Sequence, residues 1–102
     1  MIDPALPNYV LNKALYKWGI GKQFFILIEE MAELTQAIIK SYRHSDNQMT
    51  KEIIEEMADV EIMLMQMRLT FTDDMEKEYQ FMFESKIRRL HYRVDNEDGG
   101  TQ

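Results

Sequence analysis

Residues 28–34 read IEEMAEL and residues 54–60 read IEEMADV, so one pattern of apolar and acidic residues occurs twice. Each copy holds two carboxylates three positions apart, and together they are Glu30, Glu33, Glu56 and Asp59, called the carboxylate set below. Both copies lie inside long segments with apolar residues at helical spacing. Because a charge in apolar surroundings costs free energy unless a partner neutralises it, the repeat predicts two helices that face each other around bound metal ions.

The composition favours helices. The chain has 102 residues, of which 45% are hydrophobic, and contains only four Gly and two Pro. This length is typical of one domain with one core, and so few turn-forming residues argue against a protein made of many strands. We therefore expect residues 1–102 to form a single domain, with 1–7 and 95–102 loosely ordered.

Charge and cysteine usage exclude several classes of function. The net charge of −6 argues against broad binding to nucleic acid or to an anionic membrane. The absence of Cys excludes disulfides and thiolate chemistry and agrees with a reducing compartment. No apolar run is long enough for a bilayer span, and the N-terminus lacks a basic segment followed by an apolar one. We expect a soluble, cytoplasmic protein without a membrane partner.

The apolar periodicity predicts four helices, at about 8–18, 22–42, 50–71 and 73–94. Predicted breaks are the Gly19–Gly21 turn, the polar connection 43–48 and the segment 72–74. Predicted N-terminal capping residues are Asn8, Thr50, and Asp73 paired with Glu76. The predicted fold class is all-α, an antiparallel four-helix arrangement completed by oligomerisation.

Each predicted helix has an apolar stripe. In the second and third helices the stripes are Leu27, Met31, Leu34 and Ile38, and Ile53, Met57, Val60, Leu64 and Met67. In the fourth helix the inward residues are Tyr79, Phe83, Ile87, Leu90 and Val94. Since a short polar loop joins the second helix to the third, we expect these two to pack antiparallel along their stripes.

Helical geometry places the carboxylates at matching angles on the two helices. At about 100° per residue, Glu30 lies roughly 40° and Glu33 roughly 100° to one side of Leu34. Glu56 and Asp59 have the same angles from Val60. The set should therefore converge along one margin of the contact between the helices, whereas Glu29, Glu55 and Glu61 point elsewhere, Glu29 and Glu55 closer to solvent.

Carboxylates brought this close require either protonation or a multivalent cation. The candidate ligands are all hard oxygens, which favour Mg²⁺, with Mn²⁺ or Ca²⁺ as substitutes, over Zn²⁺ or copper. The alternative is that both acidic pairs are solvated helix faces. Duplication at one angle in apolar surroundings favours the metal site.

These residues resemble a known family. An ExxE pair on one helix and an ExxD pair on the next are similar to the MazG-type, all-α nucleoside triphosphate pyrophosphohydrolases. The resemblance covers about residues 15–93. It also includes Trp18-Gly19 followed by Gln23, Ala32-Glu33-Leu34, Ala58-Asp59-Val60, and the basic stretch from Lys86 through Arg89.

The resemblance implies hydrolysis of a nucleoside triphosphate, or its deoxy form, to the monophosphate and pyrophosphate. It implies that the carboxylate set holds Mg²⁺ ions that bind the triphosphate, and that a water oriented by one acid attacks the α-phosphorus. Asp59 is then a metal ligand, and Glu30 or Glu33 has the better claim on the water. Members of the family usually assemble as dimers or tetramers, so a homodimer or homotetramer is expected.

Four further residues are predicted to bind substrate. Lys86 and Arg89 share a helical face with Arg93 and would contact phosphates, although cations near a helix C-terminus are also favoured without a ligand. Trp18 and Gln23 would stack on and hydrogen-bond a nucleobase, although a lone Trp at a helix end is more often part of a core. The base preference is open.

A second class of function remains. The alternative to the enzyme is a non-catalytic helical dimerisation module whose acids face a basic partner, and such a module needs no Mg²⁺. A di-iron bundle requires Glu-x-x-His pairs, and neither His44 nor His91 has a Glu three positions earlier.

Overall fold

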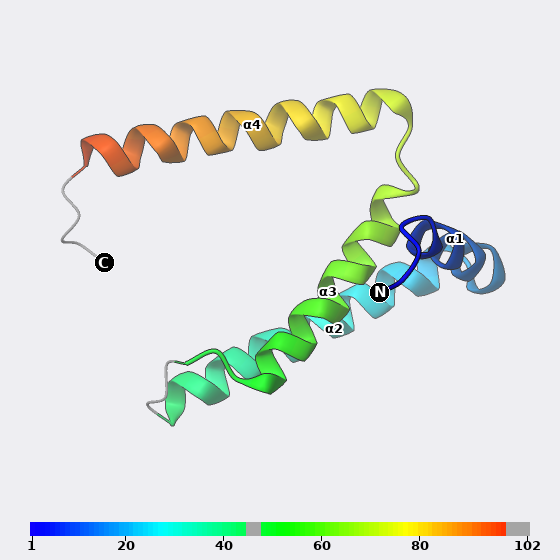
Figure 1. Ribbon diagram of the computed structural model, residues 1–102, viewed down its shortest axis with the longest axis horizontal. Coiled ribbons are helices and arrows are strands. Elements are labelled where there is room, and N and C mark those ends of the chain that lie inside the picture. Colours follow the sequence, from blue (N-terminus) through cyan, green and yellow to red (C-terminus); the bar gives the residue numbers. More distant parts are fainter. Residues whose placement is uncertain (45–47, 98–102) are drawn as a thin grey trace. The chain divides into compact units, whose positions relative to one another are not determined.

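The computed structural model describes residues 1–44 and 48–97, and within these ranges it contains four α-helices and no strand. They are α1 (Leu6–Trp18), α2 (Ile20–Arg43), α3 (Lys51–Arg68) and α4 (Asp73–Asn96), shown in Figure 1. The predicted all-α class is confirmed. None of the helices in the described ranges is long and apolar enough to cross a membrane.

The chain forms two compact units, Met1–Thr70 with α1 to α3, and Phe71–Gln102 with α4. In the first unit, α2 and α3 lie side by side along much of their length, and α1 contacts both. The antiparallel arrangement of all four helices and the single domain over 1–102 stay predictions.

The first helix begins earlier than predicted. The Ala5 N–H donates to Asp3 Oδ1 at 2.8 Å, and the Leu6 N–H donates to the Asp3 carbonyl at 2.9 Å. These bonds form a tight turn that leads directly into α1, with a proline in its first turn, where a missing N–H costs nothing. The prediction that Asn8 caps this helix is therefore wrong.

One glycine separates α1 from α2. Gly19 has a φ of 90°, its N–H donates to the Leu15 carbonyl at 2.9 Å, and its own carbonyl accepts from the Gln23 N–H at 3.2 Å. A positive φ is strained for any residue with a Cβ, so glycine is favoured here. The predicted three-residue turn was too long, because Ile20 and Gly21 are already helical.

The ends of α2 and α3 meet where the chain reverses. Ser41 Oγ donates to the Gln48 carbonyl at 3.1 Å, and Lys40 Nζ lies 3.7 Å from Glu52 Oε1. The Thr50 hydroxyl accepts from the Ile53 N–H at 3.1 Å, so the predicted cap is confirmed. Two helix ends differ from prediction: α2 includes Arg43 at the chain reversal, and α3 stops at Arg68 at its far end. Residues 45–47 of the predicted connection lie outside the described residues.

The core of the first unit is small. Its buried hydrophobic residues are Leu11 of α1, Leu27 and Ala37 of α2, and Ile53 of α3. Gln66 is buried with them, and its Nε2 donates to the Leu11 carbonyl at 3.2 Å, tying α3 to α1.

The predicted stripes are only partly buried. Met31, Ile38, Met57 and Leu64 keep between 43% and 48% of their surface exposed. The buried residues of α2 are Gln23, Leu27, Ala37 and Ser41, so Leu27 of the predicted stripe is buried together with three residues outside the stripe. Each of these two stripes therefore has a buried member, Leu27 or Ile53, and other members that are partly exposed.

The α4 helix begins at a threonine cap. The Thr72 hydroxyl accepts from the Met75 N–H at 3.2 Å, and Asp73 is the first helical residue, so the predicted Asp73 cap is wrong by one position. Three acids in the first turn complement the helix dipole. The helix continues through Asn96, beyond the predicted end, and 98–102 of the predicted loose tail lie outside the described residues.

Aromatic rings pack along the start of this second unit. The Phe71 and Tyr79 rings are 5.9 Å apart between centroids, and the Tyr79 and Phe83 rings are 6.5 Å apart. No residue of α4 is buried, however, so the stripe predicted to face inward is exposed.

The Thr50 cap gives a direct test of what stabilises the start of α3. Thr50→Ala removes the acceptor for the Ile53 N–H and should lower the free energy of unfolding by about 1 kcal/mol. Thr50→Ser keeps the acceptor and is the matched control. Urea denaturation followed by circular dichroism measures both, and equal midpoints for the alanine variant and the wild type would contradict this role.

Candidate functional site

Three members of the carboxylate set meet in space. One carboxylate oxygen from each of Glu30, Glu33 and Glu56 lies within 4.8 Å of the other two. Glu30 and Glu33 come from adjacent turns of α2, and Glu56 comes from α3, which lies beside it. The i and i+3 spacing puts the α2 pair on one face, and packing of the two helices adds the third group.

Asp59 does not join this group of three, although its charge acts on it. The negative charge of Asp59 contributes to raising the pKa of both Glu30 and Glu56. Its side chain is one methylene shorter than that of Glu, so the same helical position carries its oxygens less far from the α3 axis. The sequence predicts matching angles for Glu30 and Glu56 and for Glu33 and Asp59, and the residue type already indicates the shorter reach of Asp59.

The environment of Glu30 favours its protonated form. Partial burial raises the pKa of its carboxyl above the ordinary value, and the charges of Asp59, Glu33 and Glu56 raise it further. A hydrogen bond with the Glu33 side chain acts in the same direction. A divalent cation reverses the effect of this environment, because it favours the ionised carboxylate.

Glu56 has a buried oxygen without a partner. Desolvation raises the pKa of its carboxyl, and the charges of Glu33, Asp59, Glu55 and Glu52 add to the rise. Its Oε2 is inaccessible to solvent and has no hydrogen-bond partner among the described residues. A buried acceptor left unpaired is costly, and a metal ion or a proton on this oxygen would remove that cost.

The group of three carboxylates offers only oxygen ligands, and Glu33 is its exposed member. Oxygen ligands of this kind suit Mg²⁺, Mn²⁺ and Ca²⁺. A cation held by the partly buried Glu30 and Glu56 would therefore remain open to solvent on the side of Glu33. Glu29, Glu55 and Glu61 are exposed, as predicted for the first two.

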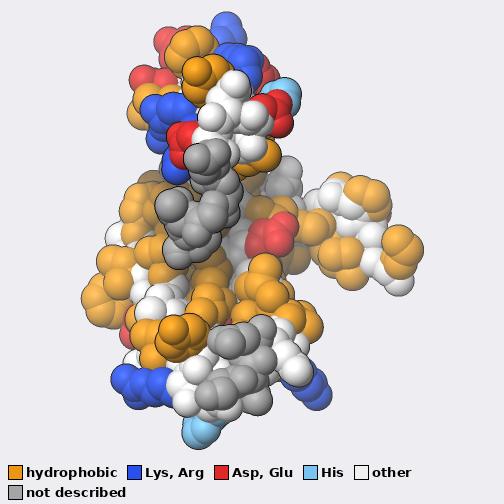
Figure 2. All heavy atoms as spheres, turned by 90° about the vertical axis from the view of Figure 1, so that its left-hand side faces the viewer, with side chains coloured by type: hydrophobic (Ala, Val, Ile, Leu, Met, Phe, Trp, Pro, Cys, Tyr) orange, Lys and Arg blue, Asp and Glu red, His pale blue; other side chains and the backbone are white. Residues whose placement is uncertain are grey.

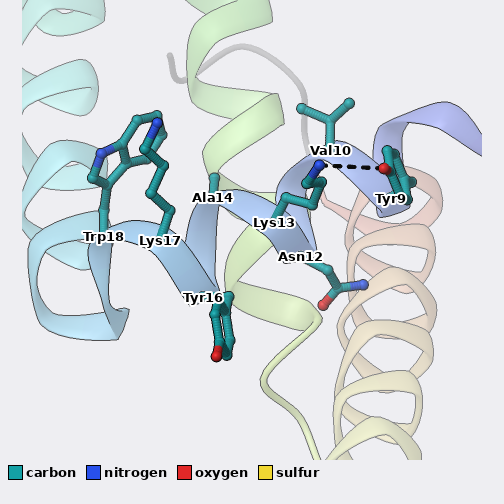
Figure 3. Close-up of a pocket in the computed structure, with 8 residues that line it drawn as sticks. All are labelled: Tyr9, Val10, Asn12, Lys13, Ala14, Tyr16, Lys17 and Trp18. Carbon is teal, nitrogen blue, oxygen red and sulfur yellow. Dashed lines mark hydrogen bonds between the residues drawn. The ribbon is translucent and has the colours of Figure 1, made fainter.

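Trp18 lies at the end of α1, half exposed, with Lys17 Nζ 5.3 Å from its ring centroid. It contributes to a hollow of about 560 Å³ whose lining residues all belong to α1. Figure 3 shows Trp18 and Lys17 pointing to one side of the helix and Tyr16 to the other. The exposed ring offers a stacking surface, and its role in base binding stays a prediction.

Gln23 is buried, whereas its predicted role in binding a nucleobase requires an accessible side chain. Its side chain is only 4% exposed, and its Nε2 has no hydrogen-bond partner among the described residues. The amide therefore retains an unused donor inside the first unit. Contact with a nucleobase edge stays a prediction.

Lys86 and Arg89 lie in the second unit, one turn apart on α4. With Phe81, Met82 and Ser85 they line a surface hollow of about 250 Å³. Both are exposed. Their helix belongs to a different unit from the carboxylates, so their contact with a substrate phosphate stays a prediction.

Two features of the first unit are not among those predicted from the sequence. The first is the buried amide of Gln66, for which a polar residue inside an apolar helix is the only signal. The second is the pairing of cations with aromatic rings on α1: Lys13 Nζ lies 5.2 Å from the Tyr9 ring centroid and donates to its hydroxyl at 3.3 Å. The i, i+4 spacing of Tyr9 and Lys13 was a signal for that contact.

The raised pKa of Glu30 predicts how the metal-free protein responds to pH. A carboxyl whose pKa is higher in the folded state than its ordinary 4.5 destabilises the fold once ionised, and this destabilisation fades as pH falls through the folded pKa. In EDTA, Glu30→Gln should therefore melt roughly 2–5 °C above the wild type near pH 8. The difference should narrow toward pH 5.

The matched control for this experiment is Glu29→Gln, which removes a neighbouring exposed carboxylate. Its melting temperature should follow that of the wild type at each pH. Thermal denaturation followed by circular dichroism gives the comparison, and a Glu30→Gln variant no more stable than the control near pH 8 would show that repulsion in the cluster is negligible.

Comparison with known proteins adds no relative: no protein-family model, curated protein or solved structure matches this chain.

Proposed function

We propose that this protein is a Mg²⁺-dependent nucleoside triphosphate pyrophosphohydrolase of the MazG type, which releases pyrophosphate and a nucleoside monophosphate. The observation that carries the proposal is the convergence of Glu30, Glu33 and Glu56 within 4.8 Å from two different helices. Two solvated acidic faces would have no reason to bring three carboxylates together, since each raises the free energy of ionising the others.

The carboxylates fit a divalent cation in their chemistry and surroundings. Glu56 Oε2 is buried without a hydrogen-bond partner among the described residues, and the pKa values of Glu30 and Glu56 are both raised. These features are those of a site that binds positive charge. Bound Mg²⁺, for which Mn²⁺ is a substitute, would offset the charge of the triphosphate and lower the pKa of a coordinated water.

The residues divide into roles by their exposure. Glu30 and Glu56 are partly buried and suit the holding of a metal, as does the short Asp59 beside them. Glu33 is exposed and can reach a water on the open side of the cluster. We therefore assign Glu33 to orienting the attacking water, which the sequence left undecided between Glu30 and Glu33.

Substrate contacts in this proposal come from the residues that the sequence singled out. The half-exposed Trp18 ring suits base stacking, and Lys86 and Arg89 suit binding of phosphate oxygens. Gln23 would bind the base only through its unused amide donor. The proposal includes an antiparallel four-helix arrangement of α1 to α4, completed by assembly into a homodimer or homotetramer.

The second candidate is a non-catalytic dimerisation module with an acidic face. The observation that favours it is the large amount of exposed apolar surface on α2, α3 and α4. It gives no role to the buried, unpaired Glu56 Oε2, and for this reason the enzyme is preferred.

Turnover separates the two candidates. Incubation with a panel of ribonucleoside and deoxyribonucleoside triphosphates and Mg²⁺ should release pyrophosphate from at least one of them. Glu33→Gln and Glu56→Gln should each reduce this release at least 100-fold, since each removes a charge from the cluster, whereas Glu29→Gln should retain it. Release of orthophosphate alone, or turnover that is unaffected by EDTA, would contradict the proposal.

Metal binding is testable without turnover. A Mg²⁺ concentration of 100 times Kd should stabilise the folded state by about 2.7 kcal/mol, which corresponds to a rise in Tm on the order of 10 °C for a chain of this size. The rise should shrink strongly in Glu56→Gln and persist in Glu29→Gln. A dimerisation module predicts equal melting temperatures with Mg²⁺ and with EDTA.

A further inference from the structure

A hollow lies at the end of the first unit where α2 ends and α3 begins. Its volume is about 530 Å³, within the range of sites that bind small molecules. Its lining residues come from the last turns of α2, from the residue that follows this helix and from the first turn of α3: Gln36, Ile39, Lys40, Arg43, His44 and Glu52. Figure 2 faces this end of the pair and shows basic side chains beside hydrophobic ones. We call this site the basic hollow.

The basic hollow differs in charge from the rest of the chain. Lys40 and Arg43 are cations, and Glu52 is the only acid in the lining. Two positive charges therefore outnumber one negative charge at this point, whereas the whole chain has a net charge of −6. A local excess of positive charge attracts small anions to the hollow, even though the protein as a whole repels them.

The cations of the hollow are available to a ligand. Lys40 Nζ lies 3.7 Å from Glu52 Oε1, and the two side chains are 66% and 53% exposed, so this ion pair contributes little to stability. Arg43 forms no ion pair with a residue in the described ranges. The end of the α2 dipole favours cations here without a ligand, but it leaves the guanidinium donors of Arg43 without a carboxylate. An anion can therefore bind both cations at little cost.

Helical geometry aligns the basic hollow with the carboxylates. At about 100° and 1.5 Å per residue, Lys40 lies roughly 20° around α2 from Glu33 and about 10 Å further along the helix. Gln36 lies between them. Because helical side chains lean toward the N-terminus of their helix, Lys40 and Arg43 lean from the hollow back toward Glu33. The open side of the carboxylate cluster and the basic hollow thus follow one another along one strip of α2.

The donors of this strip suit phosphate oxygens. The Arg43 guanidinium offers parallel N–H groups that match a phosphate, Lys40 adds a point charge, and the Gln36 amide adds a neutral donor. A polyphosphate held by a metal ion at Glu33 can therefore extend along α2 into the hollow. We propose that Gln36, Lys40 and Arg43 bind the pyrophosphate end of the substrate. The identity of the substrate rests on the proposed function, whereas the anion site requires only the residues of the hollow.

This placement gives the chain a means of distinguishing phosphate chains by length. A nucleoside triphosphate has two phosphates beyond the α-phosphorus, and these are the groups that reach the hollow; a monophosphate has none. Lys40 and Arg43 also share a helix with Glu30 and Glu33. The phosphate contacts that they provide therefore do not depend on the second unit, to which Lys86 and Arg89 belong.

Binding of inorganic pyrophosphate to the full chain tests the anion site. Calorimetric titration in EDTA excludes any contribution from a metal ion at the carboxylates. Arg43→Gln and Lys40→Gln should each weaken binding about tenfold, since each removes hydrogen bonds to a charged group. Glu52→Gln should tighten it roughly threefold, because the competing carboxylate is lost.

The matched control is Lys22→Gln, which makes the same change of charge at an exposed position near the other end of α2. It should bind pyrophosphate as the wild type does, and circular dichroism should be the same for all four variants. Absence of binding to the wild type, or equal affinities for Arg43→Gln and Lys22→Gln, would overturn the proposal.

Kinetics show whether the hollow binds the substrate or only a free anion. Arg43→Gln should raise KM for a nucleoside triphosphate about tenfold and weaken inhibition by pyrophosphate to the same extent. A variant with weaker pyrophosphate binding and unchanged KM would overturn the placement of the substrate and leave the proposed function intact. If the wild type hydrolyses no nucleotide, the proposed function fails, and the calorimetric titration still decides whether the hollow is an anion site.

Discussion

The packing of α2 against α3 holds together groups that repel one another, and the other features of the first unit depend on this constraint. Burial of Leu27, Ala37 and Ile53 stabilises the contact between the two helices. The same contact brings Glu56 to within 4.8 Å of Glu30 and Glu33, where each charge raises the free energy of ionising the next. A core this small is a modest source of stability, so a cation that offsets the repulsion would contribute to the fold and to function together.

The α2–α3 pair separates two kinds of surface. The acids of the carboxylate set lie on one side of the helix contact, and uncharged, mostly apolar residues lie on the other. This separation explains why so many large side chains remain exposed in a chain whose periodicity is strongly helical. A helix that is apolar well beyond the width of one contact has more than one partner. The α2 helix contacts both α3 and α1, and large apolar side chains on the rest of its surface are exposed.

Much of the fold follows from local chemistry. The Thr50 hydroxyl caps α3, as its position in the sequence predicts. Gly19, with its positive φ, separates the end of α1 from the start of α2. The errors have local causes as well. The N-cap of α4 is Thr72 rather than Asp73, because the Thr72 hydroxyl accepts a hydrogen bond from the Met75 N–H. Asp3 organises a turn that starts α1 two residues before Asn8, a bond that apolar periodicity does not reveal.

The sequence by itself determined the helical class and the matching angles of the two acidic pairs, because residue spacing along a helix is a local property. Only the tertiary structure decided which oxygens meet, since that depends on the line along which α2 and α3 pack. This line includes Leu27 of the predicted stripe but also Gln23, Ala37 and Ser41 beside it, and it leaves Glu56 Oε2 buried without a hydrogen-bond partner among the described residues. It also leaves Asp59 outside the group of three. Periodicity shows which face of each helix is apolar. Which residues of that face meet in the contact depends on side chains that are far apart in the chain.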